Sequence, residues 1–336
     1  MKAVDVAKVS VEAPARLHMG FLDMHGGLGR RFGSIGLCLQ EIATELSVVP
    51  ADTVQAQGPS AELARQDMHR LQAQIGLSGG VKITVNRAIP EHSGLGSGTQ
   101  MAMAVGTAVN RLLGLGYTPQ ELSLLLQRGR RSGIGISTFI AGGFIVDGGH
   151  SDETRIPPVL CQSPVPDTWR FLLVLDTQHR GLSGRDEVQA FQQLPPMDEA
   201  AAGHICRRVL MQAMPAIREG DCRAFGAAIS VVQGMIGDYF SACQGGGRYS
   251  SPAVGEVVRF LQEHGATGVG QSSWGPTGFA IYANETQAHQ ALRQARQLLA
   301  GDTALEVKVC RARNNPATVQ VQEAVVGKAR RNKAGV

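Results

Sequence analysis

The chain has 336 residues, which is enough for two domains with sizeable apolar cores. Its formal net charge is only +4, and the segment 323–336 supplies most of it with four cations against one acid. The body is therefore nearly neutral, which argues against a protein that coats nucleic acid. The cations are mostly arginine, 26 against 6 lysines, and the planar arginine fork suits phosphate and carboxylate.

The six cysteines are widely separated, with no C-x-x-C pair and no histidine at the spacing of a metal site. This pattern favours neither a disulfide framework nor a zinc site. The N-terminus shows no apolar targeting segment, and no apolar run approaches the length that crosses a bilayer. We expect a reduced, cytoplasmic protein that binds neither a membrane nor nucleic acid.

The first half mixes short strands with one long apolar helix. Alternation of apolar residues predicts strands, and helical spacing predicts helices. We expect strands over 4–13, 35–49 (one or two) and 81–85, helices over 61–75, 99–113 and 119–128, and a strand with a turn, or a strand pair, over 139–149. Residues 151–168, with four prolines, are typical of a connection.

The second half alternates helices with strands in a different order. We expect a strand over 171–176, helices near 199–219 and 222–239, and then helix, strand, strand, helix and strand over 251–313. This order indicates an α+β layer of helices on a mainly antiparallel sheet. The basic end, 323–336, is predicted to be solvated and to have no specific role.

Residues 90–100, Pro-Glu-His-Ser-Gly-Leu-Gly-Ser-Gly-Thr-Gln, join a predicted strand to a helix. Three glycines let the backbone approach an anion closely, and the free N–H groups of the helix start favour negative charge. The predicted phosphate or pyrophosphate ligands are Ser93, Gly94, Leu95, Gly96, Ser97, Gly98, Thr99 and Gln100. The alternative is a tight turn with a Ser or Thr cap and no ligand.

Three further glycine-bearing segments, 13–36, 128–137 and 268–278, occur in a fixed order with this loop. Together they resemble the GHMP superfamily of small-molecule kinases, whose first motif begins Pro-Ala-Arg and whose second reads Pro-x-x-x-Gly-Leu-Gly-Ser-Ser. The resemblance implies an α+β, GHMP-kinase-like fold with two domains. It implies an N-terminal, ribosomal-S5-domain-2-like α/β domain over 1–165, a C-terminal, ferredoxin-like α+β domain over 166–322, and a basic tail over 323–336.

The resemblance fails at two positions that kinase chemistry needs. Superfamily kinases carry Ser-Gly-Val-Asp where this chain has Ser132-Gly133-Ile134-Gly135, and Gly98 replaces the second Ser of the loop. Glycine neither accepts a proton nor orients a hydroxyl group. The chain therefore keeps the anion-binding loop but lacks two groups that a kinase uses, so we do not expect phosphoryl transfer.

One branch of the superfamily fits the chain more closely. The segments 15–23, 129–135, 142–149 and 270–276 resemble the β-ribofuranosylaminobenzene 5′-phosphate synthase family, which acts in methanopterin-type cofactor biosynthesis. The resemblance implies a pentosyltransferase that condenses 5-phosphoribosyl-1-pyrophosphate with 4-aminobenzoate, or with 4-hydroxybenzoate in some members, and releases CO2 and pyrophosphate. We expect Mg²⁺ as the cofactor and a homodimer.

Arg16 and His18 alternate with Leu17, so they share one side of a strand and are predicted catalytic residues. The alternative for this pair is a structural hydrogen bond. Asp23 is also placed among the catalytic residues, where it holds Mg²⁺ with Ser97 or orients His18; alternatively it caps the following turn. Arg130 and Arg131 are predicted to clamp phosphate.

The predicted substrate-binding residues come from three segments with glycines. Trp274 either stacks on the aromatic substrate or packs between domains, and Asp147 is expected to close a turn. His179, Arg180 and Arg185 are expected in a loop after the strand 171–176, at the domain junction, from which they could reach the sugar phosphate. The full predicted set is Gly133, Gly135, Ser137, Arg180, Gln271, Ser272, Ser273 and Trp274.

Two other functional classes remain open from the sequence. One is an ATP-dependent small-molecule kinase whose base comes from elsewhere, for example Asp23 or Asp176. The other is a phosphometabolite-binding protein without catalysis.

Overall fold

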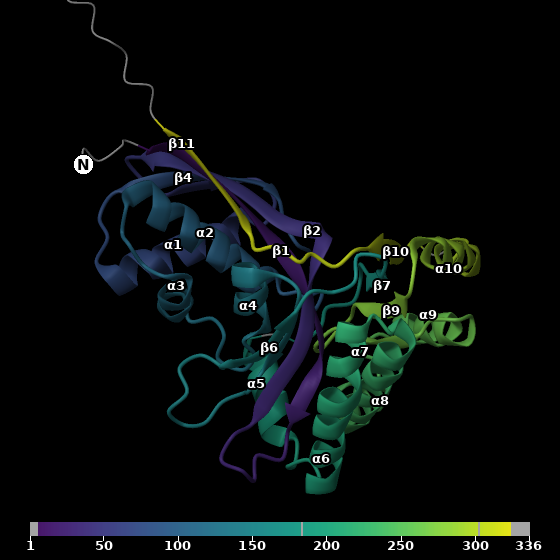
Figure 1. Cartoon of the computed structure of the whole chain (residues 1–336). Helices are drawn as coiled ribbons and strands as arrows, with labels where there is room; N and C mark the ends of the chain where they lie inside the picture. The colour runs from purple at the N-terminus through teal and green to yellow at the C-terminus, as the bar shows by residue number, and fades with distance from the viewer. Residues whose placement is uncertain (1–5, 183, 302, 324–336) are drawn as a thin grey trace, which may run out of the picture.

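The computed structural model describes residues 6–182, 184–301 and 303–323. Two sheets organise the chain (Figure 1). The first sheet has the order β11-β1-β2-β4-β3, with β5 paired to β2 and β6 paired to β5. Its strands are β1 (Val6–Asp23), β2 (Phe32–Ala51), β3 (Gln55–Gln57), β4 (Gly80–Arg87), β5 (Phe144–Asp147), β6 (Val159–Ser163) and β11 (Thr318–Glu323).

The second sheet is antiparallel and has the order β10-β7-β9-β8. Its strands are β7 (Arg170–Asp176), β8 (Gly268–Gln271), β9 (Gly278–Tyr282) and β10 (Leu305–Cys310). Alternate residues of β7 face opposite sides, so Leu172 and Val174 pack beneath α9 (Pro252–Glu263) and α10 (Glu285–Leu298). Phe171 and Leu173 face the other side, toward α8 (Cys222–Phe240).

The helices of the first half cover one part of the first sheet. They are α1 (Ala61–Ile75), α2 (Ser97–Leu113), α3 (Pro119–Leu125) and α4 (Ile134–Ala141). The second half adds α5 (Gly184–Gln193), α6 (Glu199–Arg208), the π-helical turn η1 (Val209–Ala213), α7 (Met214–Glu219) and the short η2 (Ser241–Cys243). Twelve of the 17 residues of α2 are buried, because this helix lies between the sheet and α1, α3 and α4.

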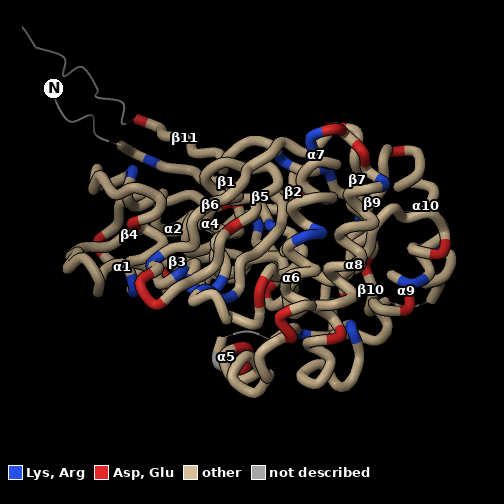
Figure 2. The backbone as a smooth tube through the Cα atoms, turned by 60° about the horizontal axis from the view of Figure 1, so that its bottom comes forward, with Lys and Arg blue, Asp and Glu red and all other residues tan. Residues whose placement is uncertain are grey.

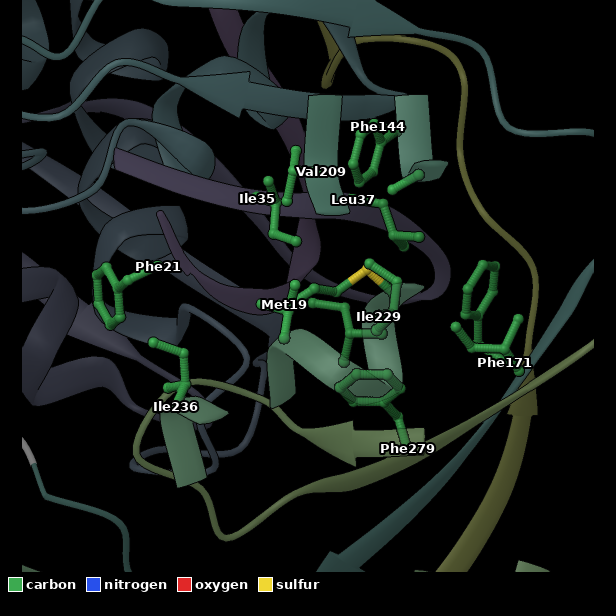
Figure 3. Packing of buried hydrophobic residues seen from close by; sticks show 14 of the residues in the cluster. Met19, Phe21, Ile35, Leu37, Phe144, Phe171, Val209, Ile229, Ile236 and Phe279 are labelled. Carbon is green, nitrogen blue, oxygen red and sulfur yellow. The ribbon is translucent and has the colours of Figure 1, made fainter. Parts of the chain in front are cut away.

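A continuous apolar core joins the two sheets. Figure 3 shows Met19 of β1 and Leu37 of β2 beside Ile229 of α8, with Phe279 of β9 and Phe171 of β7 close by. These residues are buried. Because long β1 and β2 reach from one core into the other, residues on β1 are held rigidly against the second half of the chain.

Most predicted elements are confirmed, and some are longer than expected. The helix 61–75 has the predicted bounds, and the order helix, strand, strand, helix, strand is found over 252–310. The strand expected over 4–13 continues to Asp23 in the described chain. The GHMP-kinase-like α+β fold is confirmed by this mixed architecture and by the comparisons reported below.

Three predictions of local structure are wrong in part, although β5 confirms a strand within 139–149 and His179 and Arg180 do lie in a loop. Phe139 lies in α4, not in a strand, because the short apolar run 134–141 is buried on all sides and its periodicity does not distinguish helix from strand. The connection 151–168 contains β6, and the expected loop with Arg185 is helical from Gly184. The predicted domain boundaries assign β11 to the second domain, whereas β11 pairs with β1 of the first sheet. The tail 324–336 lies outside the described residues.

Charged residues are interspersed over the described chain, as Figure 2 shows. No helix in the described part of the chain is long and apolar enough to span a bilayer.

Candidate active site

A cleft of about 930 Å³ opens where the glycine loop meets the second half of the chain. Its walls come from β1, the loop before α2, the segment after α3, helix α5 and the loop after β8. Arg16, Arg128 and the backbone N–H groups at the start of α2 form one part of the lining, here called the anion end, and Phe21, Phe32, Phe191 and Trp274 form another, here called the aromatic end. Arg31 and Arg131 border the aromatic end, with their guanidinium carbons 5.7 and 5.6 Å from the ring centroids of Phe32 and Phe191. The cleft therefore offers a site for an anion beside a site for an apolar group.

The glycine loop ends in the start of α2 at Ser97. Gly96 takes a left-handed conformation with φ +84°, and in the described structure no side chain caps the helix and its first turn holds no acid. Gly94 is equally constrained, since a Cβ there would lie 2.3 Å from the Ser272 carbonyl oxygen. The first N–H groups of α2 are thus available to an anion.

Two contacts fasten this loop to β1 and to the loop after β8. The Gly94 carbonyl accepts hydrogen bonds from Nη1 of Arg16 and from Oγ of Ser272, the latter at 2.6 Å. Ser272 Oγ also accepts the backbone N–H of His18 at 3.0 Å. Ser272 is fully buried and connects β1, the glycine loop and the loop after β8 through these hydrogen bonds.

The cleft is strongly cationic. Its described lining contains five arginines and only two acids, Glu91 and Glu187. Burial lowers the pKa of Arg16 to about 10, and the negative charge of Glu187 acts against this shift. The Glu187 carboxylate forms an ion pair with Arg131 at 2.5 Å. The five arginines are Arg16, Arg31, Arg128, Arg130 and Arg131.

His18 is only 2% exposed, yet neither of its ring nitrogens has a partner among the described residues. Burial lowers its pKa well below the usual value, and the charge of Arg16 lowers it further. The ring is therefore neutral near pH 7, with one nitrogen that donates and one that accepts. Its centroid lies 4.6 Å from that of Phe21, at the aromatic end of the cleft.

Edge-to-face contacts order the aromatic end. Phe191 of α5 contacts Phe21 and Phe32, with ring centroids 5.9 and 5.5 Å apart. Trp274 stacks on Phe240 at 4.0 Å and is 1% exposed, so it is fixed by packing between α5 and α8. Phe21, Phe32, Phe191 and Trp274 thus form one packed aromatic cluster along the cleft.

The predicted site residues fall into three groups in the structure. Residues that line the cleft are Arg16, His18, Gly94, Gly96, Ser97, Gly98, Thr99, Arg130, Arg131, Ser273 and Trp274. Four predicted residues lie next to the lining and support it: Ser93, Leu95, Gln100 and Ser272. The Ser93 hydroxyl donates to the Pro90 carbonyl, and the Gln100 amide donates to the Gly135 carbonyl. Residues outside its lining are Asp23, Gly133, Gly135, Ser137, Arg180 and Gln271.

Several of the outside residues have a structural role. Asp23 Oδ1 accepts the backbone N–H groups of His25 and Gly26, at 2.7 and 2.9 Å, which is the turn cap left open as an alternative. The Gln271 side chain bonds Gln244 and the backbone of Ser250. Arg180 is exposed, and Ser137 is buried in α4.

Asp147 closes a turn, as expected, and also fixes the motif around Gly133. Its two carboxylate oxygens accept the N–H groups of Gly133 and Gly149, at 2.9 and 3.0 Å. Burial raises the Asp147 pKa to about 6, against the opposing effect of these hydrogen bonds. This carboxylate is occupied by the backbone and does not line the cleft.

Sequence reasoning did not select Arg31, Arg128 and Glu187, which also line the cleft. Arg128 belongs to the quoted Arg128-Gly129-Arg130-Arg131 run, so its signal was present in the motif. Glu187 was not identifiable, because its place depends on α5 folding over the cleft.

A magnesium site held by Ser97 and Asp23 does not fit this structure. Ser97 lines the cleft, whereas Asp23 does not and uses Oδ1 in its turn. No group of three or more His, Cys, Asp or Glu residues in the described chain could hold a metal. One hydroxyl group is a poor protein contribution to Mg²⁺, which prefers carboxylates and substrate phosphates.

The alternative bases for a kinase are also occupied elsewhere. Asp176 accepts the Ser251 hydroxyl at 2.7 Å and the backbone N–H groups of Gln178 and His179. A Cβ at Gly135 would lie 3.0 Å from Cγ2 of Thr99, so a side chain at this position requires the Thr99 side chain to shift.

Comparisons with known proteins agree with this architecture. The model of the GHMP kinases N terminal domain matches residues 62–143, and that of the GHMP kinases C terminal matches residues 213–301. The "Beta-ribofuranosylphenol 5'-phosphate synthase" of Methanothermobacter thermautotrophicus is 32% identical over 82% of this chain and 89% of its own length.

A relative with the same printed name, from Archaeoglobus fulgidus, is 30% identical over 93% of this chain and 99% of its own length. Among solved structures, the phosphomevalonate kinase of Streptococcus pneumoniae superposes with a TM-score of 0.67 at 14% identity. That match covers 91% of this chain and 100% of the kinase, and it supports the fold alone.

Proposed function

Because the chain belongs to the β-ribofuranosylphenol 5′-phosphate synthase family, we propose that it is a decarboxylating phosphoribosyltransferase. Its substrates in this proposal are 5-phosphoribosyl-1-pyrophosphate and 4-hydroxybenzoate or 4-aminobenzoate, and its place is in the synthesis of a methanopterin-type cofactor. The observation that carries the proposal is the two-part cleft, with a cationic helix start at one end and aromatic rings around a neutral histidine at the other.

The donor's pyrophosphate fits the anion end. The start of α2 supplies uncapped N–H groups, and Arg16 and Arg130 supply forked donors for phosphate oxygens. Arg131 is paired with Glu187 and lies over Phe191, so it is not assigned to the pyrophosphate. The assigned groups stabilise the negative charge that develops as the C1–O bond of the ribose breaks. Since they are fixed before the reaction, they need little reorganisation.

The acceptor ring fits the aromatic end. Phe21, Phe32 and Phe191 supply an apolar, aromatic lining, and the ring nitrogens of the neutral His18 have no partner among the described residues. We place the 4-hydroxyl or 4-amino group against the acceptor nitrogen of His18, which would stabilise the positive charge that the ring acquires during attack. This arrangement points the carboxylate-bearing carbon toward the donor.

The bond changes balance without an external base. The ring carbon that bears the carboxylate forms a bond to C1 of the ribose while pyrophosphate leaves. The C–CO2 bond then breaks, and its electron pair restores the aromatic ring. Holding both substrates in attack geometry supplies much of the acceleration, about 7 to 11 kcal/mol in well-oriented systems.

The test is release of labelled CO2 from carboxyl-labelled 4-hydroxybenzoate and 4-aminobenzoate, with and without the phosphoribosyl donor. Release that depends on the donor supports the proposal, and the ratio of the two rates assigns the acceptor. Donor binding without CO2 release would instead indicate the binding protein considered above. The same assay with a chelator tests the expected Mg²⁺, and light scattering tests the expected homodimer.

A further inference from the structure

Arg128 follows α3 and lies against the start of α2. A Cβ at Gly98 would lie 3.3 Å from Nη1 of Arg128, so this guanidinium borders the N–H groups expected to receive an anion. Its side chain is 24% exposed and lines the cleft. Arg128 therefore belongs with the anion end, although it points there from a different segment than Arg16.

A carboxylate behind Arg128 holds it in this position. Asp67 of α1 is completely buried, and its Oδ1 accepts from Nη2 of Arg128 at 2.9 Å. The same oxygen accepts from Nη1 of Arg70 at 2.6 Å, one turn further along α1. Burial raises the Asp67 pKa, and the two arginines act against that rise.

This cluster is poorly optimised as a purely structural contact. Both arginines share Oδ1, while Oδ2 of Asp67 and Nε of Arg128 are buried without a partner in the described structure. A buried ion with an unsatisfied oxygen is costly, and an apolar side chain at the same place is often at least as stable. The cluster does, however, fix Arg128 so that Nη1 faces the helix start.

We propose that Asp67 is a positioning residue that holds Arg128 as a pyrophosphate-binding side chain beside Gly98. Asp67 touches no substrate; it acts through Arg128, whose Nη1 donates to an oxygen of the bound polyphosphate. The inference rests on the proposed function for the identity of the polyphosphate as the donor's leaving group. Arg70 shares the carboxylate but lies outside the cleft lining, so it serves as the control.

The test measures binding of inorganic pyrophosphate by calorimetry to the wild type and to Asp67→Asn, Arg128→Gln, the double variant and Arg70→Gln. We expect Asp67→Asn and Arg128→Gln each to weaken binding by about tenfold, as for loss of one charged hydrogen bond. The double variant should bind no more weakly than Arg128→Gln, because one residue acts through the other. Arg70→Gln should lower the melting temperature and leave pyrophosphate affinity unchanged.

Additive losses in the double variant, or normal affinity in Asp67→Asn, would overturn the inference. If Asp67→Asn does not fold, Asp67→Glu keeps the charge and displaces it, and normal pyrophosphate affinity in that variant would also overturn it. Pyrophosphate binding is separate from turnover. If the wild type releases CO2 with the donor but Asp67→Asn binds pyrophosphate normally, only this inference is refuted. If Asp67→Asn weakens pyrophosphate binding but the wild type releases no CO2, only the proposed function is refuted.

Discussion

Replacing Arg16 with Lys is the sharpest test of the anion end. Arg16 uses Nη1 to hold the Gly94 carbonyl, and its backbone N–H donates to the Leu95 carbonyl at 3.0 Å. A lysine keeps a positive charge but cannot hold the loop and grip a phosphate with one planar fork. Loss of one hydrogen bond to a charged group costs about 1.5 to 3 kcal/mol. We therefore expect kcat/KM to fall by about ten- to hundredfold.

The assay is donor-dependent CO2 release at several donor concentrations, together with thermal unfolding. Arg30→Lys is the matched control, because the Arg30 guanidinium also donates to backbone carbonyls, those of Gly148 and Gly149, but lies outside the cleft lining. The Arg30→Lys variant should at most lower the melting temperature and should leave kcat/KM unchanged. An Arg16→Lys variant with a lowered melting temperature and normal kcat/KM would show that Arg16 is only structural.

Four further outcomes are expected. Gly98→Asp should abolish CO2 release and leave the fold intact, because a carboxylate would occupy the leaving group's site; normal pyrophosphate binding by this variant would contradict the assignment. Gly135→Asp should lower the melting temperature, since its Cβ would crowd Thr99, and should give no ADP from ATP and test alcohols. His18→Asn should reduce kcat, and an unchanged rate and pH profile would remove His18 from the site. Asp147, whose pKa is raised from 3.8 to about 6, stabilises the fold fully below its unfolded pKa and loses this contribution as pH rises through 6. The free energy of unfolding, measured with denaturant, should therefore fall by on the order of 3 kcal/mol between pH 4 and 7. A free energy of unfolding that does not change over this range would contradict the raised pKa.

The sequence predicted the parts of the site whose signals are local. Residues close together in the chain determine the glycine loop and the helix that follows it. They also determine the alternation that brings Arg16 and His18 to one side of a strand. The resemblance supplied the fold. It did not decide between the alternatives for Asp23, because a carboxylate before a glycine turn is equally suited to a cap and to a metal.

The remaining parts depend on contacts between distant segments. Asp67 and Arg128 are 61 residues apart in sequence, and no periodicity links a buried acid on α1 to an arginine after α3. Glu187 enters the cleft because α5 packs Phe191 against the aromatic end. Such pairings are properties of the packed fold, so a single sequence does not contain a local signal for them.

The proposed reaction and phosphoryl transfer need different groups in this cleft. A kinase needs an acid or another group that orients the attacking hydroxyl, and this chain has glycine at position 135, where a Cβ would lie 3.0 Å from Cγ2 of Thr99. A reaction in which pyrophosphate leaves and a ring carbon attacks needs no such group. It needs fixed cations at the leaving group and an uncharged partner near the ring, which Arg16 and the neutral His18 supply from one face of β1. In the proposed reaction, β1 therefore holds the group beside the leaving pyrophosphate and the group beside the ring in a fixed relation to each other.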